Sequence, residues 1–84
     1  MGNYGTDIQA ALATQIKAEM AAKDWTQADL AGSANIPTST LHRYLNGARD
    51  IPLPVFAEIA RALGLSMIEL AQRAERRLEG KDVL

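Results

Sequence analysis

The sequence contains no cysteine and only one histidine, which excludes a disulfide framework and leaves too few ligands for a closed zinc site. No run approaches the roughly 20 apolar residues of a membrane-spanning helix, and nothing at the start resembles a signal peptide. A glycine-rich phosphate loop and a convincing pair of catalytic carboxylates are also missing. We therefore expect a cytoplasmic protein that is not an enzyme, carries no metal or cofactor and contacts no membrane.

An excess of charge of one sign is missing too, because nine basic residues are balanced by ten acidic ones and the formal net charge is −1. Nucleic-acid binders often have a basic domain, so this balance predicts modest non-specific affinity and few phosphate contacts per monomer. The distribution of charge matters more than its sum, since salt screens each charge beyond about 10 Å. Residues 36–49 contain two arginines, one histidine and no acid, so a surface without negative charge is expected there.

The short chain limits the architecture. Its 84 residues are expected to form one domain, residues 1–84, with a core over about residues 6–79. This length leaves no room for a separate effector-binding domain, so no small-molecule effector is expected. Apolar residues recur at helical spacing in five segments, and no segment has a strand signal. The predicted fold class is therefore all-α, with five helices.

Capping residues and apolar stripes predict the helix boundaries. The first helix is expected to begin at Thr6, where Gln9 completes a capping box, and to end near Lys23. Residues 1–5 would then form a short arm. The buried stripe of this helix consists of apolar residues four positions apart: Ile8, Leu12, Ile16 and Met20.

The second and third helices are separated by a tight turn. Thr26 is the expected N-cap of the second helix, with Asp29 completing its capping box. Asn35 falls where the chain must turn sharply, and asparagine tolerates the left-handed conformation better than most residues. The third helix is expected over about residues 38–46, where Gly47 would stop it.

The last two helices complete the predicted fold. The fourth is expected over about residues 54–63. The fifth begins with a capping box of Ser66 and Glu69, and Gly80 is expected to end it. Arg73 lies four residues after Glu69, a spacing at which the two side chains can form an ion pair.

The third helix has two opposed faces. At about 100° per residue, one arc of roughly 140° holds only polar side chains: Thr38, Ser39, His42, Arg43 and Asn46. The opposite arc of about 100° holds Leu41, Tyr44 and Leu45. A solvated helix face usually carries several carboxylates, and this polar face carries none. Such a hydrogen-bonding surface suits a groove lined by base edges and phosphates.

A set of individually weak signals at fixed spacings identifies a family resemblance. These signals are Thr26 and Gln27, Leu30 and Ala31, Leu41, Asn46 and Gly47, Ile59 and Ala60, residues 62–64 and residues 66–70. Together they resemble the helix-turn-helix domain of the phage-repressor and Cro type, also called the xenobiotic-response-element family. The resemblance covers about residues 8–70 and implies a repressor-like five-helix fold that binds double-stranded DNA.

Two positions depart from the family pattern. Pro37 stands where a serine or threonine usually caps the recognition helix. Either Thr38 caps the helix one residue later, or Pro37 occupies a position in its first turn. Asn35 replaces the frequent turn glycine. The register of the first recognition residues is therefore open by about one position.

The resemblance implies two groups of DNA contacts. Base edges would be contacted by Thr38, Ser39, His42 and Arg43. The sugar–phosphate backbone would be contacted by Gln27, Asn46 and Arg49. Arg43 is the strongest candidate, because a guanidinium can bind guanine O6 and N7 bidentately. Other roles stay open, since the hydroxyls of Thr38 and Ser39 can cap backbone amides and His42 can simply be solvated.

The function expected from these patterns is a sequence-specific transcriptional regulator that binds a double-stranded DNA operator as a homodimer. Ile68, outside the apolar stripe of the fifth helix, is a candidate dimer contact. Arg73, Arg76 and Arg77 are expected to stabilise the end of that helix rather than to bind DNA. The alternative is an antitoxin-like or anti-regulator module that binds another protein. The acid-free face of the third helix disfavours that alternative.

Overall fold

The computed structural model describes residues 3–82, and in this part of the chain there are five α-helices and no strand. The helices are α1 (Tyr4–Lys23), α2 (Gln27–Ala34), α3 (Thr38–Leu45), α4 (Leu53–Ala62) and α5 (Met67–Asp82). The predicted all-α class is confirmed, and the ends of α1 and α4 lie within one residue of their expected positions.

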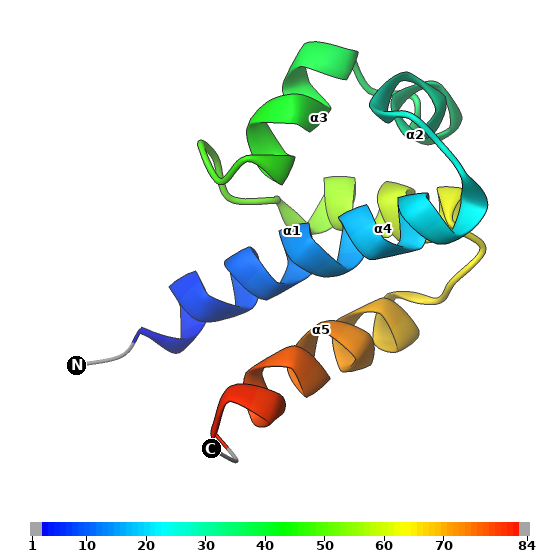
Figure 1. The fold of residues 1–84 in the computed structure, drawn as a ribbon. Coiled ribbons are helices and arrows are strands. Elements are labelled where there is room, and N and C mark those ends of the chain that lie inside the picture. The colour runs from blue at the N-terminus through cyan, green and yellow to red at the C-terminus, as the bar shows by residue number, and fades with distance from the viewer. Residues whose placement is uncertain (1–2, 83–84) are drawn as a thin grey trace.

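The five helices divide the molecule into two sides (Figure 1). The two longest helices, α1 and α5, lie side by side and share the most extensive helix–helix contact. The short pair α2 and α3 lies on the opposite side of α1 and α4 from α5. Because α2 packs on α4 and α3 packs on α1, these two helices hold the short pair in place against the rest of the domain.

One apolar core joins all five helices. Each helix contributes one large, fully buried aliphatic side chain to this core: Ile16, Leu30, Leu41, Ile59 and Leu70. The stripe predicted for α1 is confirmed, with three of its members buried and Ile8 packed at the edge of the core. Removing the side chain of any fully buried leucine would cost about 2–5 kcal/mol, so the position of each helix depends on its neighbours.

The start of α1 differs from the prediction. The helix begins two residues earlier than Thr6, and its N-cap is Asn3, whose Oδ1 accepts a hydrogen bond from the Thr6 backbone N–H at 3.2 Å. Gln9 is not part of a capping box, because its amide is bonded to the backbone of Ile51 instead. The predicted arm therefore belongs to α1 from Tyr4 onward, and the first two residues of that arm lie outside the described residues.

The capping boxes predicted for α2 and α5 are confirmed. In each one, the cap hydroxyl accepts from the backbone N–H three residues later, and the carboxylate there accepts from the backbone N–H of the cap. The hydrogen bond from the Ser66 backbone lowers the pKa of Glu69, with help from the Ser66 side chain. These bonds satisfy amide donors that a helix start otherwise leaves without partners.

Gly80 does not end α5, which continues to Asp82. A glycine stops a helix where the chain turns into the left-handed region, as it does at Gly47 and Gly64, with φ of 81° and 77°. Inside a helix, glycine costs only about 1 kcal/mol relative to alanine and can be tolerated. The fraying predicted for the last four residues concerns Lys81 and Asp82, which are helical, and two residues outside the described range.

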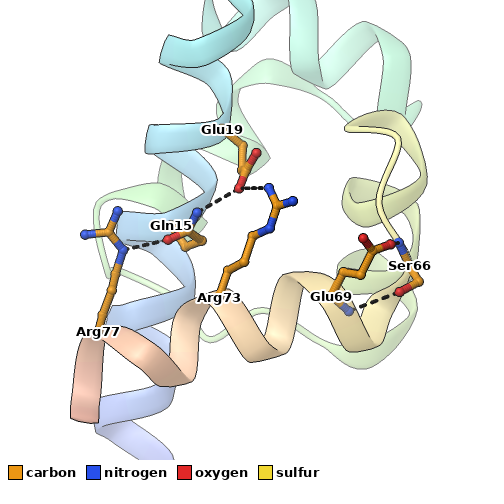
Figure 2. Close-up of polar contacts among 6 residues, drawn as sticks. All are labelled: Gln15, Glu19, Ser66, Glu69, Arg73 and Arg77. Atoms are coloured by element: carbon orange, nitrogen blue, oxygen red, sulfur yellow. Dashed lines mark hydrogen bonds and ion pairs between the residues drawn. The ribbon is translucent and has the colours of Figure 1, made fainter. Parts of the chain in front are cut away.

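Polar side chains join α1 to α5 in what we call the α1–α5 clamp (Figure 2). Arg73 Nη1 donates to Glu19 Oε2 at 2.7 Å, and Gln15 Nε2 donates to the same oxygen at 2.7 Å. Arg77 Nε donates to Gln15 Oε1, also at 2.7 Å. The predicted ion pair between Arg73 and Glu69 is wrong, because the Glu69 carboxylate is held by the capping box and Arg73 reaches across to α1.

The clamp affects the ionisation of its carboxylate. Partial burial raises the pKa of Glu19, but hydrogen bonds from Arg73 and Gln15 outweigh that effect and leave the pKa below its ordinary value. The hydrogen bond between Arg73 and Glu19 also raises the pKa of Arg73. The clamp therefore favours the charged state of both partners.

Within residues 3–82 no helix is both long and apolar enough to span a bilayer. The same part of the chain holds no group of three or more His, Asp or Glu side chains arranged as metal ligands.

Candidate nucleic-acid interface

The turn between α2 and α3 is built from backbone hydrogen bonds. Asn35 caps the C-terminus of α2 with φ of 59°, which confirms the predicted left-handed turn. The Ile36 backbone N–H donates to the Ala31 carbonyl at 3.0 Å, and the Ile36 side chain packs against the core. These contacts fix the angle at which α3 leaves α2.

Pro37 is itself the N-cap of α3, so neither arrangement predicted for it is correct. Its backbone is extended, with φ of −62° and ψ of 141°, and its carbonyl accepts the first helical hydrogen bond from Leu41 N–H at 3.0 Å. No side chain caps this helix. Thr38 is therefore the first helical residue, and the hydroxyls of Thr38 and Ser39 are not used as caps.

The two faces predicted for α3 are confirmed. Leu41, Tyr44 and Leu45 are at most 5% exposed and belong to the core. All the polar residues of the opposite arc are exposed: Thr38, Ser39, His42, Arg43 and Asn46. The helical assignment ends at Leu45, and Asn46 is the C-cap. The outer face of α3 is thus accessible along its whole length.

A hydrogen bond joins the outer face of α3 to the first residue of α2. His42 Nδ1 lies 3.2 Å from Gln27 Oε1, and Gln27 is half-buried. With its oxygen bonded to His42, the amide has its NH₂ group left to donate. Phosphate oxygens only accept hydrogen bonds, so a free NH₂ group suits the contact predicted between Gln27 and the sugar–phosphate backbone of DNA.

The residues that follow α3 form a second ordered segment. Asn46 Oδ1 accepts from the Ala48 backbone N–H at 3.1 Å, which leaves the Asn46 NH₂ group as a donor. Gly47 adopts the left-handed conformation that lets the chain fold back. The Arg43 carbonyl then accepts from the backbone N–H groups of Ala48 and Arg49, at 2.9 and 3.3 Å. Arg49 is thereby positioned beside the end of α3.

Gln9 anchors this segment from α1, a role that the sequence analysis missed. The Ile51 backbone N–H donates to Gln9 Oε1 at 2.7 Å, and Gln9 Nε2 donates to the Ile51 carbonyl at 3.3 Å. Ile51 itself is 5% exposed and belongs to the core. A small cavity beside the contact is lined by Gln9, Arg49 and neighbouring residues. In the sequence, the only indication of this role was that Gln9 lies next to the apolar stripe of α1. Its position alone did not identify Ile51 as the partner.

Neither arginine of the interface has a side-chain partner among residues 3–79, whose side chains the structure describes. Among these residues no hydrogen bond or ion pair involves the guanidinium of Arg43 or Arg49, and both side chains are exposed. No acidic residue occurs from Ile36 to Arg49. The two guanidinium groups are therefore available to an external anion or acceptor.

Comparison with known proteins gives a consistent result. The sequence matches the helix-turn-helix family of the Cro and phage-repressor type over residues 16–70. Among curated proteins, no sequence matches this chain.

Two solved structures share the fold. A crystal structure of the clp gene regulator ClgR from Corynebacterium glutamicum is similar over 90% of this chain and 81% of its own, with a TM-score of 0.81 and 20% identity. A second crystal structure of ClgR is similar over 83% of this chain and 91% of its own, with a TM-score of 0.75 and 21% identity. At this level of identity the similarity shows the arrangement of helices alone.

The family match covers more than half of the chain and includes α2, the turn and α3. The chain therefore belongs to the helix-turn-helix family of the Cro and phage-repressor type, and it is a sequence-specific DNA-binding transcriptional regulator.

Proposed function

We propose that α3 is the recognition helix, that it enters the major groove of an operator, and that its exposed polar residues contact base edges. These residues are Thr38, Ser39, His42 and Arg43. One observation carries the proposal: the outer face of α3 is exposed, polar and free of acids, while the opposite face is part of the core. A helix of this kind fits the width of the major groove of B-form DNA.

The sugar–phosphate contacts are assigned to Gln27, Asn46 and Arg49. Both amides have their oxygen bonded within the protein, so each presents donors to phosphates that only accept. Arg49 is held beside α3 because its own backbone N–H and that of Ala48 both donate to the Arg43 carbonyl. Contacts of this type fix the register of a protein on the duplex, whereas base contacts specify the sequence.

The proposal assigns the whole of residues 1–84 to one DNA-binding domain with its core over about residues 6–79. Two copies would bind half-sites about one helical turn apart, which is the usual arrangement for this motif. Ile68 is 69% exposed and is the candidate contact between the copies. The regulator would act in the cytoplasm by occupying its operator, without a small-molecule effector.

Selection from a random duplex library tests the proposal directly. The full chain should enrich a palindromic consensus whose half-sites are about 10 base pairs apart, centre to centre. Titration of the selected duplex should then shift the NMR resonances of α3 and of the start of α2, and leave the α1–α5 clamp unchanged. Failure to enrich any sequence, or shifts confined to α5, would refute the assignment of α3.

A further inference from the structure

The hydrogen bond between α2 and α3 restricts the protonation state of His42. Its Nδ1 lies 3.2 Å from the amide oxygen of Gln27, and an amide oxygen can only accept a hydrogen bond. The shared proton must therefore be on Nδ1. In a neutral imidazole one ring nitrogen carries the proton and the other carries a lone pair, so Nε2 is then an acceptor.

The other ring nitrogen has no partner within the described residues. His42 is exposed on the outer face of α3, and no hydrogen bond to Nε2 is formed by residues 3–79, whose side chains are described. The neighbouring residue on this face is Arg43, whose guanidinium can only donate. The two adjacent side chains therefore offer opposite hydrogen-bonding groups to the same groove.

Contact with DNA would reinforce this state of the imidazole. The two ends of the Gln27 amide have opposite polarity, and phosphate oxygens accept hydrogen bonds only from its NH₂ end. With that end facing a phosphate, the amide oxygen necessarily faces His42. The phosphate contact and the tautomer of the imidazole thus require the same orientation of one amide group.

We propose that Gln27 holds His42 in the Nδ1–H tautomer, so that His42 Nε2 accepts a hydrogen bond from the exocyclic amine of adenine or cytosine in the major groove. In that groove adenine N6 and cytosine N4 are donors, whereas guanine O6 and thymine O4 are acceptors. The opposite tautomer would present a donor and reverse this preference. Gln27 is then a residue that determines specificity without touching a base. The inference rests on the proposed function, since it assumes that α3 lies in the major groove.

The tautomer can be measured without DNA, because His42 is the only histidine in the chain. Nitrogen-15 spectra of the neutral imidazole should show the proton on Nδ1. Gln27→Ala removes the acceptor and should shift the equilibrium toward Nε2–H. Gln27→Glu keeps an acceptor at this position and should preserve Nδ1–H. The control Gln72→Ala, at an exposed position of α5, should leave the spectrum unchanged.

Selected duplexes test the consequence for base recognition. One position in each half-site should prefer adenine or cytosine, and Gln27→Ala or His42→Ala should reduce that preference about three- to tenfold, the value of one hydrogen bond. Gln27→Glu separates the two roles of Gln27. It should weaken binding to all duplexes, because a carboxylate repels phosphate, while keeping the preference at this position.

The outcomes distinguish this inference from the proposed function. A proton on Nε2 in the unaltered protein, or a spectrum that Gln27→Ala leaves unchanged, refutes the tautomer. A normal consensus without an adenine or cytosine preference that depends on His42 refutes the base contact and leaves the assignment of α3 intact. Failure of the unaltered protein to select any duplex refutes the proposed function, and with it the base contact.

Discussion

The two sides of this molecule use arginine in opposite ways. On the α1–α5 side, Arg73 and Arg77 are hydrogen-bonded to Glu19 and Gln15 of the facing helix. On the α2–α3 side, the guanidinium groups of Arg43 and Arg49 have no partner among the side chains described, those of residues 3–79.

This difference shows why the total charge of the chain is a poor guide to its surface. The chain balances nine basic residues with ten acidic ones, and two of these acids pair with arginines: Glu19 with Arg73 of the facing helix, and Glu58 with Arg61 of its own helix. The segment from Ile36 to Arg49 contains no acid, so its charge is not compensated locally. Arg43 and Arg49 thus differ from Arg73 and Arg77 in having guanidinium groups that are not used in bonds between the described helices, and in lying in a segment without acids.

The largest effect on the binding side is expected for Arg43→Ala. Loss of a bidentate contact to guanine should reduce the ratio of specific to random binding by about 1–3 kcal/mol, or roughly 5- to 150-fold. Competition binding with the selected and random duplexes would measure this ratio. Arg76→Ala, at an exposed position of α5, is the matched control and should leave it unchanged. An unaltered ratio in Arg43→Ala would show that this arginine does not read a base.

The next effect is expected at the connection between the two sides. Gln9→Ala removes both hydrogen bonds to the Ile51 backbone, at a cost to folding of about 1–2 kcal/mol. It should also weaken binding to specific and random duplexes alike, because the segment that carries Arg49 is no longer anchored. Denaturant unfolding and duplex titration would measure the two effects. Loss of stability with unchanged binding would mean that Gln9 does not position Arg49.

Arg49→Ala should have a smaller effect that is uniform across sequences. Removing one phosphate contact per monomer should weaken binding several-fold and lower the slope of log affinity against log salt by about 0.9 for each monomer bound. Binding measured at several salt concentrations would give this slope. A change in sequence preference without a change in slope would place Arg49 at a base instead.

The smallest effect is expected on the structural side, for Glu19→Gln. The pKa of Glu19 is lowered in the folded state, so its carboxylate stabilises the fold above its ordinary pKa of 4.5. That stabilisation disappears as the pH falls through the lowered pKa. The variant should therefore unfold at a lower temperature than the unaltered protein at pH 7, and the difference should shrink in acid.

DNA binding by Glu19→Gln should stay unchanged, which sharpens the contrast between the two sides. Glu58→Gln is the control, because the exposed carboxylate of Glu58 is bonded to Arg61 of its own helix, whereas the contact of α4 with the Ser33 carbonyl of α2 is made by Arg61. If the difference in unfolding temperature between Glu19→Gln and the unaltered protein did not depend on pH, a role for the ionised carboxylate would be contradicted.

The elements that could be predicted from the sequence are those controlled by near neighbours. The capping boxes at Thr26 and Ser66 depend on a residue three positions away, and the turn at Asn35 depends on its own conformational preference. The two faces of α3 follow from helical periodicity alone. These features need no knowledge of how the helices pack.

Two of the features that were missed or wrong depend on distant residues. Gln9 lies three residues after Thr6, which is the spacing of a capping box, yet its partner is Ile51, 42 residues away. Arg73 has an acid at helical spacing, yet it bonds to Glu19, 54 residues away. A local pattern cannot choose between a neighbour and a partner that only the fold brings close. The contacts assigned to DNA stay predictions for the same reason, since their partner is outside the chain.

The proline that caps the start of α3 affects how easily the DNA sequence preference of this regulator could change. A side-chain cap ties the identity of a residue to the stability of its helix, and replacing such a cap typically costs about 1 kcal/mol. Here the start of the helix depends on the pyrrolidine ring and backbone of Pro37, with φ already at −62°. Thr38 and Ser39 can therefore be varied together at little thermodynamic cost, so that, if they contact bases as proposed, new operator preferences could be engineered or evolve on an unchanged scaffold.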